Sequence, residues 1–146
     1  MRIIHCAPFN IITKTGGALY ANPIKISQGL IQNNHFVHNF DYRDTSRYMS
    51  FFRNKKNGQK KMNEFFRTLV NDICPELIIF GHAELITEDT FEYIKKKNIR
   101  MIFWYNDIPL QEHFKSIAYY FDFILTTAGG DFIQDIKKYN ENAFFL

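Results

Sequence analysis

Two adjacent glycines, Gly16 and Gly17, follow the first apolar segment of the chain and precede a helical pattern. Glycine has no side chain to exclude a ligand and adopts positive φ readily, so the pair suits a loop that opens toward a phosphate or a sugar. The alternative is an ordinary tight turn, which is what glycine pairs usually mark. We take Gly16, Gly17 and the nearby Tyr20 as candidate substrate-binding residues.

Four polar residues stand at or directly after the ends of other apolar segments: His82, Asn106, Asp107 and Thr127. Imidazole titrates near physiological pH and a carboxylate can take a proton from a hydroxyl group, so His82 and Asp107 are alternative candidates for a catalytic base. Asn106 and Thr127 are candidate substrate-binding residues. The structural alternatives are a helix cap for Asp107 and a capping or loop role for His82.

Asp41 and Arg43 occupy the same kind of position after the segment 35–40, and they complete the set of candidate substrate-binding residues. Within that segment His35 and His38 would point to opposite faces of a strand, and no third ligand lies nearby in the sequence. Zinc sites need three or four converging ligands. We therefore expect no metal and no other cofactor.

Short apolar segments alternate with helical patterns along the chain. The expected strands begin or lie within 2–9, 35–40, 76–81, 99–105, 121–127 and 143–146, and the expected helices are 21–34, 59–73, 87–98 and 130–140. Apolar strands separated by helices describe a parallel sheet covered on both faces. The sequence predicts an α/β protein, a Rossmann-like three-layer α/β/α domain with a mainly parallel sheet of about six strands. Ligands of such sheets bind beyond the carboxyl ends of the strands, where the candidate residues fall.

Composition places the chain among soluble globular proteins. It has 146 residues, most simply one domain over 1–146, with 46% hydrophobic and 23% charged residues. A net charge of +3 is only mildly basic, so we expect no nucleic-acid partner. A signal sequence and a span of about 20 apolar residues are both lacking, which favours a cytoplasmic location. Cys6 and Cys74 lie in or beside apolar segments and are expected to be reduced and buried.

The segment 46–61 belongs to none of these strands and mixes aromatic residues with lysine and arginine. One interpretation is an insertion whose rings fold onto the core while its lysines remain in solvent. The other is a cationic surface that binds anionic lipid or an anionic acceptor, giving peripheral contact with the inner face of a membrane. Salt-sensitive sedimentation with acidic liposomes would distinguish the two.

Several segments occur in a familiar order: the loop TGGALY, the helix ANPIKISQGLIQNNHFV, then PELIIFGHAEL, IRMIFWYNDIP and FDFILTTAGGDFIQDIKKYNENAFFL. In this order they resemble the N-terminal domain of GT-B glycosyltransferases, especially the family-4-like and spore-maturation CgeB-like groups. The likeness covers nearly the whole chain. It implies half of a two-domain enzyme that moves a sugar from a nucleotide-sugar donor to an acceptor, in a cleft between two Rossmann-like domains.

In such enzymes the N-terminal half mainly holds the acceptor, here of unknown identity. The resemblance places Gly16 and Gly17 near the donor phosphates or the transferred sugar, where backbone amides could stabilise the leaving diphosphate. It also implies that a bound metal is not usually required. The second, donor-binding domain lies outside 1–146, either as a missing C-terminal half or as a separate subunit. We therefore expect this chain alone to be inactive.

The sequence departs from the pattern at one expected position. Many relatives have a histidine at the end of the strand MIFWYND, where this chain has Tyr105, Asn106 and Asp107. An inverting mechanism would leave Asp107 or His82 as the base, whereas in a retaining one Asn106 and Asp107 would orient the substrate.

Two hypotheses of other classes stand beside the enzyme. One is a noncatalytic Rossmann-like module that binds a nucleotide or anionic ligand, or docks a partner through its aromatic residues. The first observation that separates it from the enzyme is whether the reading frame continues past Leu146 into a second α/β domain. The other is a flavodoxin-like or response-regulator-like domain, which is disfavoured because HCAPFN stands at the end of the first strand in place of an acidic cluster.

Overall fold

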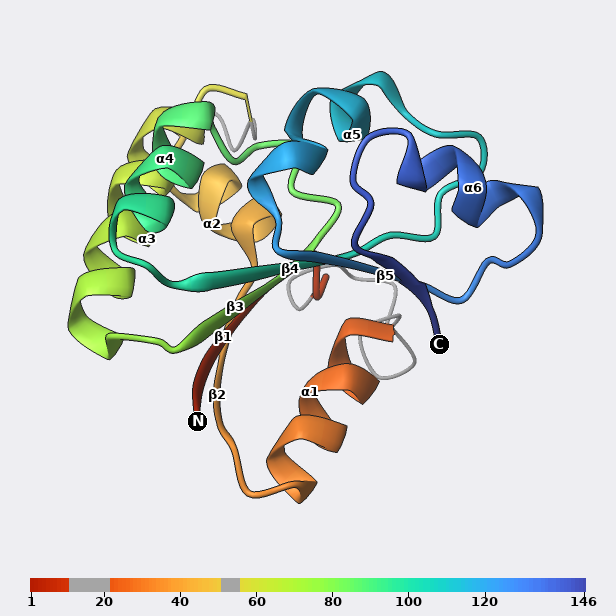
Figure 1. Ribbon diagram of the computed structural model, residues 1–146. Helices are drawn as coiled ribbons and strands as arrows, with labels where there is room; N and C mark the ends of the chain where they lie inside the picture. The colour runs from red at the N-terminus through yellow and green to blue at the C-terminus, as the bar shows by residue number, and fades with distance from the viewer. Residues whose placement is uncertain (11–21, 51–55) are drawn as a thin grey trace.

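The computed structural model describes residues 1–10, 22–50 and 56–146 (Figure 1). Within these ranges six strands form one sheet in which all neighbouring strands are parallel. The strands are β1 (Arg2–Cys6), β2 (Phe36–Phe40), β3 (Leu77–Gly81), β4 (Arg100–Trp104), β5 (Phe123–Thr126) and β6 (Ala143–Phe145). The helices are α1 (Asn22–Gln32), α2 (Tyr42–Tyr48), α3 (Gln59–Ile73), α4 (Glu88–Lys96), α5 (Glu112–Ile117), the 3-10 helix η2 (Ala118–Tyr120) and α6 (Asp131–Lys137). The predicted Rossmann-like α/β architecture is confirmed.

The strand order is β2-β1-β3-β4-β5-β6, so the chain reverses its direction across the sheet between β1 and β3. Because parallel crossovers are right-handed, the reversal puts the connecting helices on opposite faces. Figure 1 shows this directly: α1 lies on one face, and α2 to α6 lie on the other. The order matches the doubly wound, flavodoxin-type order 2-1-3-4-5 extended by one strand.

Aromatic rings fill the core between the sheet and α2 to α6. Phe80 of β3 is completely buried, and its ring centroid lies 5.4 Å from that of Phe91 and 5.6 Å from that of Phe121. Phe121 in turn lies 4.6 Å from Phe103 of β4. Offset and edge-on pairs of this kind add stability beyond the burial of their area. Much of the phenylalanine content therefore serves this one core layer.

Two short helices, α2 and α5, were not expected from the sequence. They have seven and six residues, too few for a periodic apolar pattern to stand out. Phe65 lies on α3 beside the buried Phe66 but is itself 46% exposed. One further expectation is corrected. Cys74, expected to be buried, is exposed, because it caps the end of α3 in a left-handed conformation just before Pro75. Cys6 is buried, as predicted.

Part of the segment 46–61 is described. Ser46 and Ser50 are buried, Tyr48 is 68% exposed, and Lys60 and Lys61 lie in the first turns of α3. Lipid contact by this segment stays a prediction. Among the described residues, no helix combines the length and the apolar character that crossing a membrane requires.

Candidate functional site

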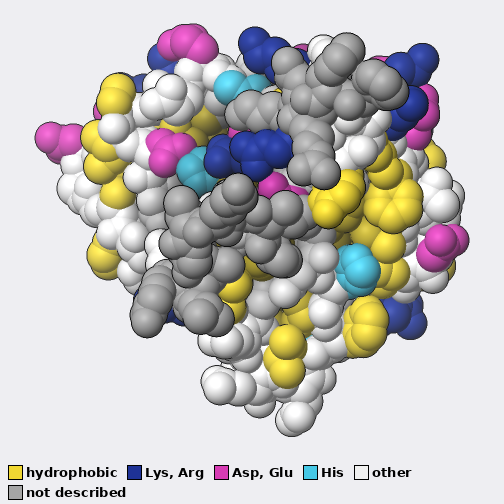
Figure 2. Space-filling view, turned by 180° about the vertical axis from the view of Figure 1, so that it is seen from behind, with side chains coloured by type: hydrophobic (Ala, Val, Ile, Leu, Met, Phe, Trp, Pro, Cys, Tyr) yellow, Lys and Arg dark blue, Asp and Glu magenta, His cyan; other side chains and the backbone are white. Residues whose placement is uncertain are grey.

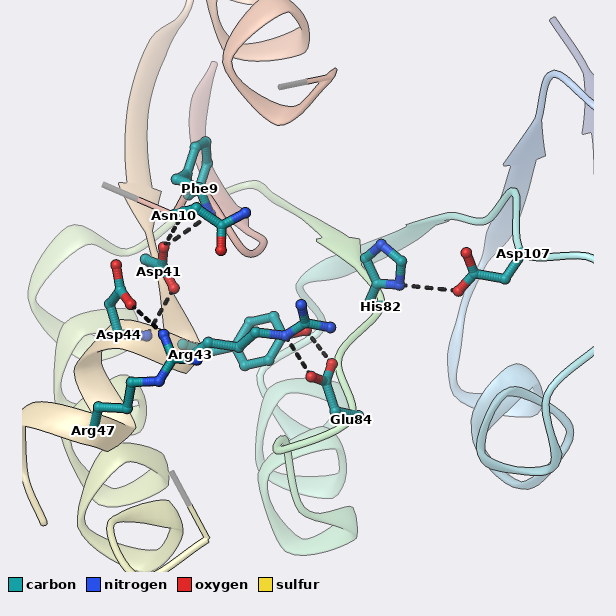
Figure 3. Close-up of polar contacts among 10 residues, drawn as sticks. Phe9, Asn10, Asp41, Arg43, Asp44, Arg47, His82, Glu84 and Asp107 are labelled. Atoms are coloured by element: carbon teal, nitrogen blue, oxygen red, sulfur yellow. Dashed lines mark hydrogen bonds and ion pairs between the residues drawn. The ribbon is translucent and has the colours of Figure 1, made fainter. Parts of the chain in front are cut away.

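His82 and Asp107 meet at the carboxyl edge of the sheet. Their strands β3 and β4 are paired with Gly81 opposite Trp104, so the residues that follow each strand emerge side by side. The His82 Nδ1 atom lies 3.0 Å from the Asp107 Oδ2 atom, and each side chain is a little less than half exposed. Figure 3 shows the imidazole ring pointing toward the carboxylate across the edge. The two residues predicted as alternative bases thus form one pair.

The local backbone supports the functional interpretation of this pair. His82 has φ of 67° and Ala83 has φ of 60°, two consecutive left-handed residues with side chains. Such conformations cost free energy and cluster at functional sites. The predicted alternative for Asp107, a helix cap, is wrong, since the next helix has Gln111 at its N-cap.

The pair borders a pocket of about 310 Å³ beneath the N-terminal end of α1. The pocket lies at the carboxyl ends of β1 and β3. From these two neighbouring strands the chain connects to opposite sides of the sheet, and this is the usual ligand position in a doubly wound sheet. The lining residues include His5, Asn10, Arg43, His82, Trp104, Asn106 and Asp107. The pocket therefore brings together four of the residues predicted from the sequence: Arg43, His82, Asn106 and Asp107.

The side-chain amide of Asn106 is oriented by β5 and the residue after it. Its Oδ1 atom accepts hydrogen bonds from Thr126 Oγ1 at 3.0 Å and from the Thr127 backbone N–H at 2.9 Å. Thr127 Oγ1 donates to the same oxygen at 3.2 Å. With its oxygen occupied, Asn106 can offer its NH₂ group as a donor to a ligand. Thr127 does not line the pocket, and it acts on the site through Asn106.

A second pocket, of about 280 Å³, lies on the α5 side of the same pair. Its walls share Arg43, His82 and Asp107 with the first pocket, and His113 and Glu84 are among the additional residues. The His113 Nε2 atom is buried and has no hydrogen-bond partner among the described residues. The pair therefore stands between two concavities. Figure 2 shows histidine, acidic and basic side chains close together on the face that it presents.

Glu84 holds Arg43 in place between the pockets, a role that the sequence reasoning missed. Its Oε1 atom accepts from Arg43 Nε at 2.5 Å, and its Oε2 atom accepts from the Tyr42 hydroxyl. Burial opposes ionisation of Glu84, but these hydrogen bonds outweigh it and lower the pKa of the carboxyl group. Burial, followed by the Glu84 charge, raises the pKa of Tyr42. Glu84 stands two residues after His82, so its presence in the same loop was a usable signal.

Asp41, predicted to bind substrate, has a structural position. Its Oδ2 atom accepts from the backbone N–H groups of Phe9 at 2.8 Å and Asn10 at 2.9 Å. Its Oδ1 atom accepts from the N–H of Asp44 at 2.9 Å, which caps α2 (Figure 3). Asp41 lines neither pocket of the pair. It ties the end of β1 to α2 and so fixes the pocket wall at Asn10.

We expect Asp41→Ala to lower the free energy of unfolding by about 2 kcal/mol, because three backbone N–H groups lose their acceptor. Asp135→Ala is the matched control, since the Asp135 side chain is half exposed and forms an exposed ion pair with Lys138 at the end of its own helix. Exposed pairs contribute about 0 to 1 kcal/mol. Urea denaturation of both variants measures the difference. Equal losses would contradict the role given to Asp41.

A buried hydrogen-bonded chain lies behind the pocket. His5 of β1 is 1% exposed, and its Nδ1 atom is 2.7 Å from Ser27 Oγ of α1. Ser27 Oγ donates to Asn39 Oδ1 of β2, also at 2.7 Å. Burial lowers the pKa of His5 to about 4, so its imidazole is neutral at physiological pH.

This shift makes stability depend on pH. The unfolded chain protonates His5 near pH 6.5 and the folded chain only near 4, so acid favours the unfolded state. We expect the contribution of His5 to be intact above pH 6.5 and to fall by about 3 kcal/mol as the pH drops to 4. Urea denaturation of the wild type and His5→Phe at several pH values measures it. Parallel pH profiles of the two proteins would contradict the assignment.

Three predicted residues, Gly16, Gly17 and Tyr20, lie outside the described residues. Comparisons with known proteins add no relative. A scan against protein-family models finds no match, and searches of curated proteins and of solved structures find no significant similarity to the chain. The likeness to GT-B glycosyltransferases therefore stays a prediction from the sequence.

Proposed function

We propose that the chain is the acceptor-binding half of a GT-B type glycosyltransferase in which His82 is the catalytic base. The observation that carries the proposal is the 3.0 Å contact between His82 and Asp107 at the rim of a pocket. Asp107 occupies Nδ1, so Nε2 is the ring nitrogen that can take a proton. A carboxylate in this position fixes the tautomer and stabilises the imidazolium that forms.

The transfer step follows from this arrangement. The acceptor hydroxyl gives its proton to His82 Nε2 as its oxygen attacks the anomeric carbon of the donor sugar. The bond from that carbon to the diphosphate oxygen breaks, and the nucleoside diphosphate leaves with the electron pair. Attack opposite the leaving group inverts the anomeric centre. General-base assistance of this kind contributes about 10² to 10⁴-fold to the rate.

The pocket chemistry supports a sugar-like acceptor. A volume of about 310 Å³ is at the small end of ligand sites, and the wall combines the Trp104 ring with the oriented Asn106 amide. Aromatic faces pack against the C–H surface of a ring, while amides pair with its hydroxyl groups. The donor nucleotide would be held by a second Rossmann-like domain, in a C-terminal half or a separate subunit, and Gly16 and Gly17 would face its phosphates.

The test is a transfer assay on the complete protein with its donor-binding partner domain. A panel of nucleotide sugars is incubated with hexose and glycolipid acceptors, and released nucleoside diphosphate and product mass are measured. We expect one donor to be consumed by the wild type and not by His82→Gln. Binding of a ligand in the pocket without turnover of any donor would contradict the enzyme and favour the noncatalytic ligand-binding module.

A further inference from the structure

His5 lines the pocket, and its hydrogen bonds determine which of its two ring nitrogens carries the hydrogen. The Ser27 hydroxyl has one hydrogen, which it donates to Asn39 Oδ1. The 2.7 Å contact between Ser27 Oγ and His5 Nδ1 therefore needs the hydrogen of the imidazole, so Nδ1 is protonated. A neutral imidazole carries only one ring hydrogen. The Nε2 atom consequently holds a lone pair.

The position of His5 gives that lone pair its importance. His5 is almost fully buried, yet it lines the pocket that His82 and Asp107 border. Within the described part of the chain, its side chain makes a hydrogen bond through Nδ1 alone. Among the described residues, the fully buried side-chain atom that has no hydrogen-bond partner is His113 Nε2, and His5 Nε2 is not of that kind. The Nε2 atom of His5 therefore opens into the pocket that His5 lines, where its lone pair can accept a hydrogen bond from a ligand.

The other polar groups of the wall narrow the class of ligand. Asn106 offers a donor, the charge of Arg43 is balanced by Glu84, and the carboxylate of Asp107 lies against His82. Among the described residues, the wall thus presents donors and acceptors at separate points, and its two charged side chains, Arg43 and Asp107, each have a partner of their own. A hydroxyl group can both donate and accept, so a neutral polyhydroxylated ring satisfies all of them at once.

We propose that His5 is a specificity-determining residue whose Nε2 atom accepts a hydrogen bond from a ring hydroxyl of a neutral, hexose-like ligand in this pocket. The identification of that ligand as a transferase acceptor rests on the proposed function, whereas the hydrogen bond itself requires no turnover. A site built to pair with a hydroxyl rejects the analogue that lacks it, because its own buried group is left unpaired.

The experiment is a titration of the uniformly ¹⁵N-labelled chain followed by long-range ¹H–¹⁵N spectra of its imidazole groups. The probes are D-glucose, D-galactose and D-mannose, with tetrahydropyran as the ring that lacks hydroxyl groups. Without ligand at pH 7 we expect His5 to be protonated at Nδ1 and unprotonated at Nε2. At least one hexose should then shift the His5 Nε2 signal, and tetrahydropyran should not.

Two variants sharpen the result. His5→Phe keeps a ring of similar shape against Phe9 but removes the acceptor, and we expect it to weaken hexose binding by at least about tenfold. His38→Phe is the matched control. On the neighbouring strand β2, Asn39 lies opposite His5 and faces α1 as His5 does. His38 precedes Asn39, so its side chain points to the other face of the sheet, and we expect hexose binding to be unchanged.

The outcomes separate this inference from the proposed function. A protonated Nε2 in the free chain, or hexose shifts at His82 and Asn106 without one at His5, would overturn the inference and leave the transferase standing. Hexose binding that depends on His5, in a complete protein that consumes no donor, would support the inference and contradict the transferase. Absence of any hexose shift in the pocket would contradict both.

Discussion

His82→Gln is expected to lower kcat of the complete protein by about 10² to 10⁴-fold while changing the acceptor KM little. Glutamine retains a polar side chain but cannot take a proton from the acceptor hydroxyl. Because the base acts only as the hydroxyl attacks, its loss affects the transition state and not the bound ground state. Steady-state kinetics with the donor found in the panel, at saturating concentration, measure both constants.

The matched control for this substitution is His38→Gln on the far face of the sheet, which should keep wild-type kcat. A fall in activity that appears only as a rise in KM would make His82 a binding residue. Unchanged kcat in His82→Gln would remove it from the chemistry altogether. Denaturation curves of both variants confirm that the comparison is made between folded proteins.

Phe80→Ala is expected to lower the free energy of unfolding by about 3 to 5 kcal/mol. Phe80 has no exposed surface and contacts rings from α3, from α4 and from Phe121, so truncation leaves a cavity at the centre of the aromatic layer. The lining rings come from several different elements and cannot all move inward together. Urea denaturation monitored by circular dichroism gives the difference.

Phe65→Ala is the comparison for that prediction, because Phe65 has the same side chain, lies on α3 and is 46% exposed. We expect a loss of about 0.5 kcal/mol there, in the range usual for surface positions. Similar losses at the two positions would mean that the aromatic layer does not carry the stability assigned to it.

The sheet could be predicted because its signal is local. The runs LIIFG and MIFW are continuously apolar, as expected of strands covered on both faces, and the helices between the strands set the parallel direction. The face of the sheet that each helix covers cannot be predicted without the strand order. That order depends on pairing between segments far apart in the chain, and no single run encodes it.

The site was predictable where it follows from sheet geometry. His82 and Asp107 each succeed a strand, and adjacent parallel strands bring such residues together. Glu84 and His5 were missed for different reasons. Glu84 acts through Arg43, which comes from another element, and His5 lies inside a strand, where a histidine is usually a core residue. Its importance appears only when Ser27 of α1 is placed beside it.

The most direct test of the central claim is a double-mutant cycle of His82→Gln and Asp107→Asn, measured as kcat/KM for transfer. Asp107 contacts the base at 3.0 Å and is proposed to act only by orienting it and stabilising its protonated form. The account therefore predicts that the double variant is scarcely less active than His82→Gln alone. Losses that multiply, as for two independent groups, would show that His82 and Asp107 do not work as one unit.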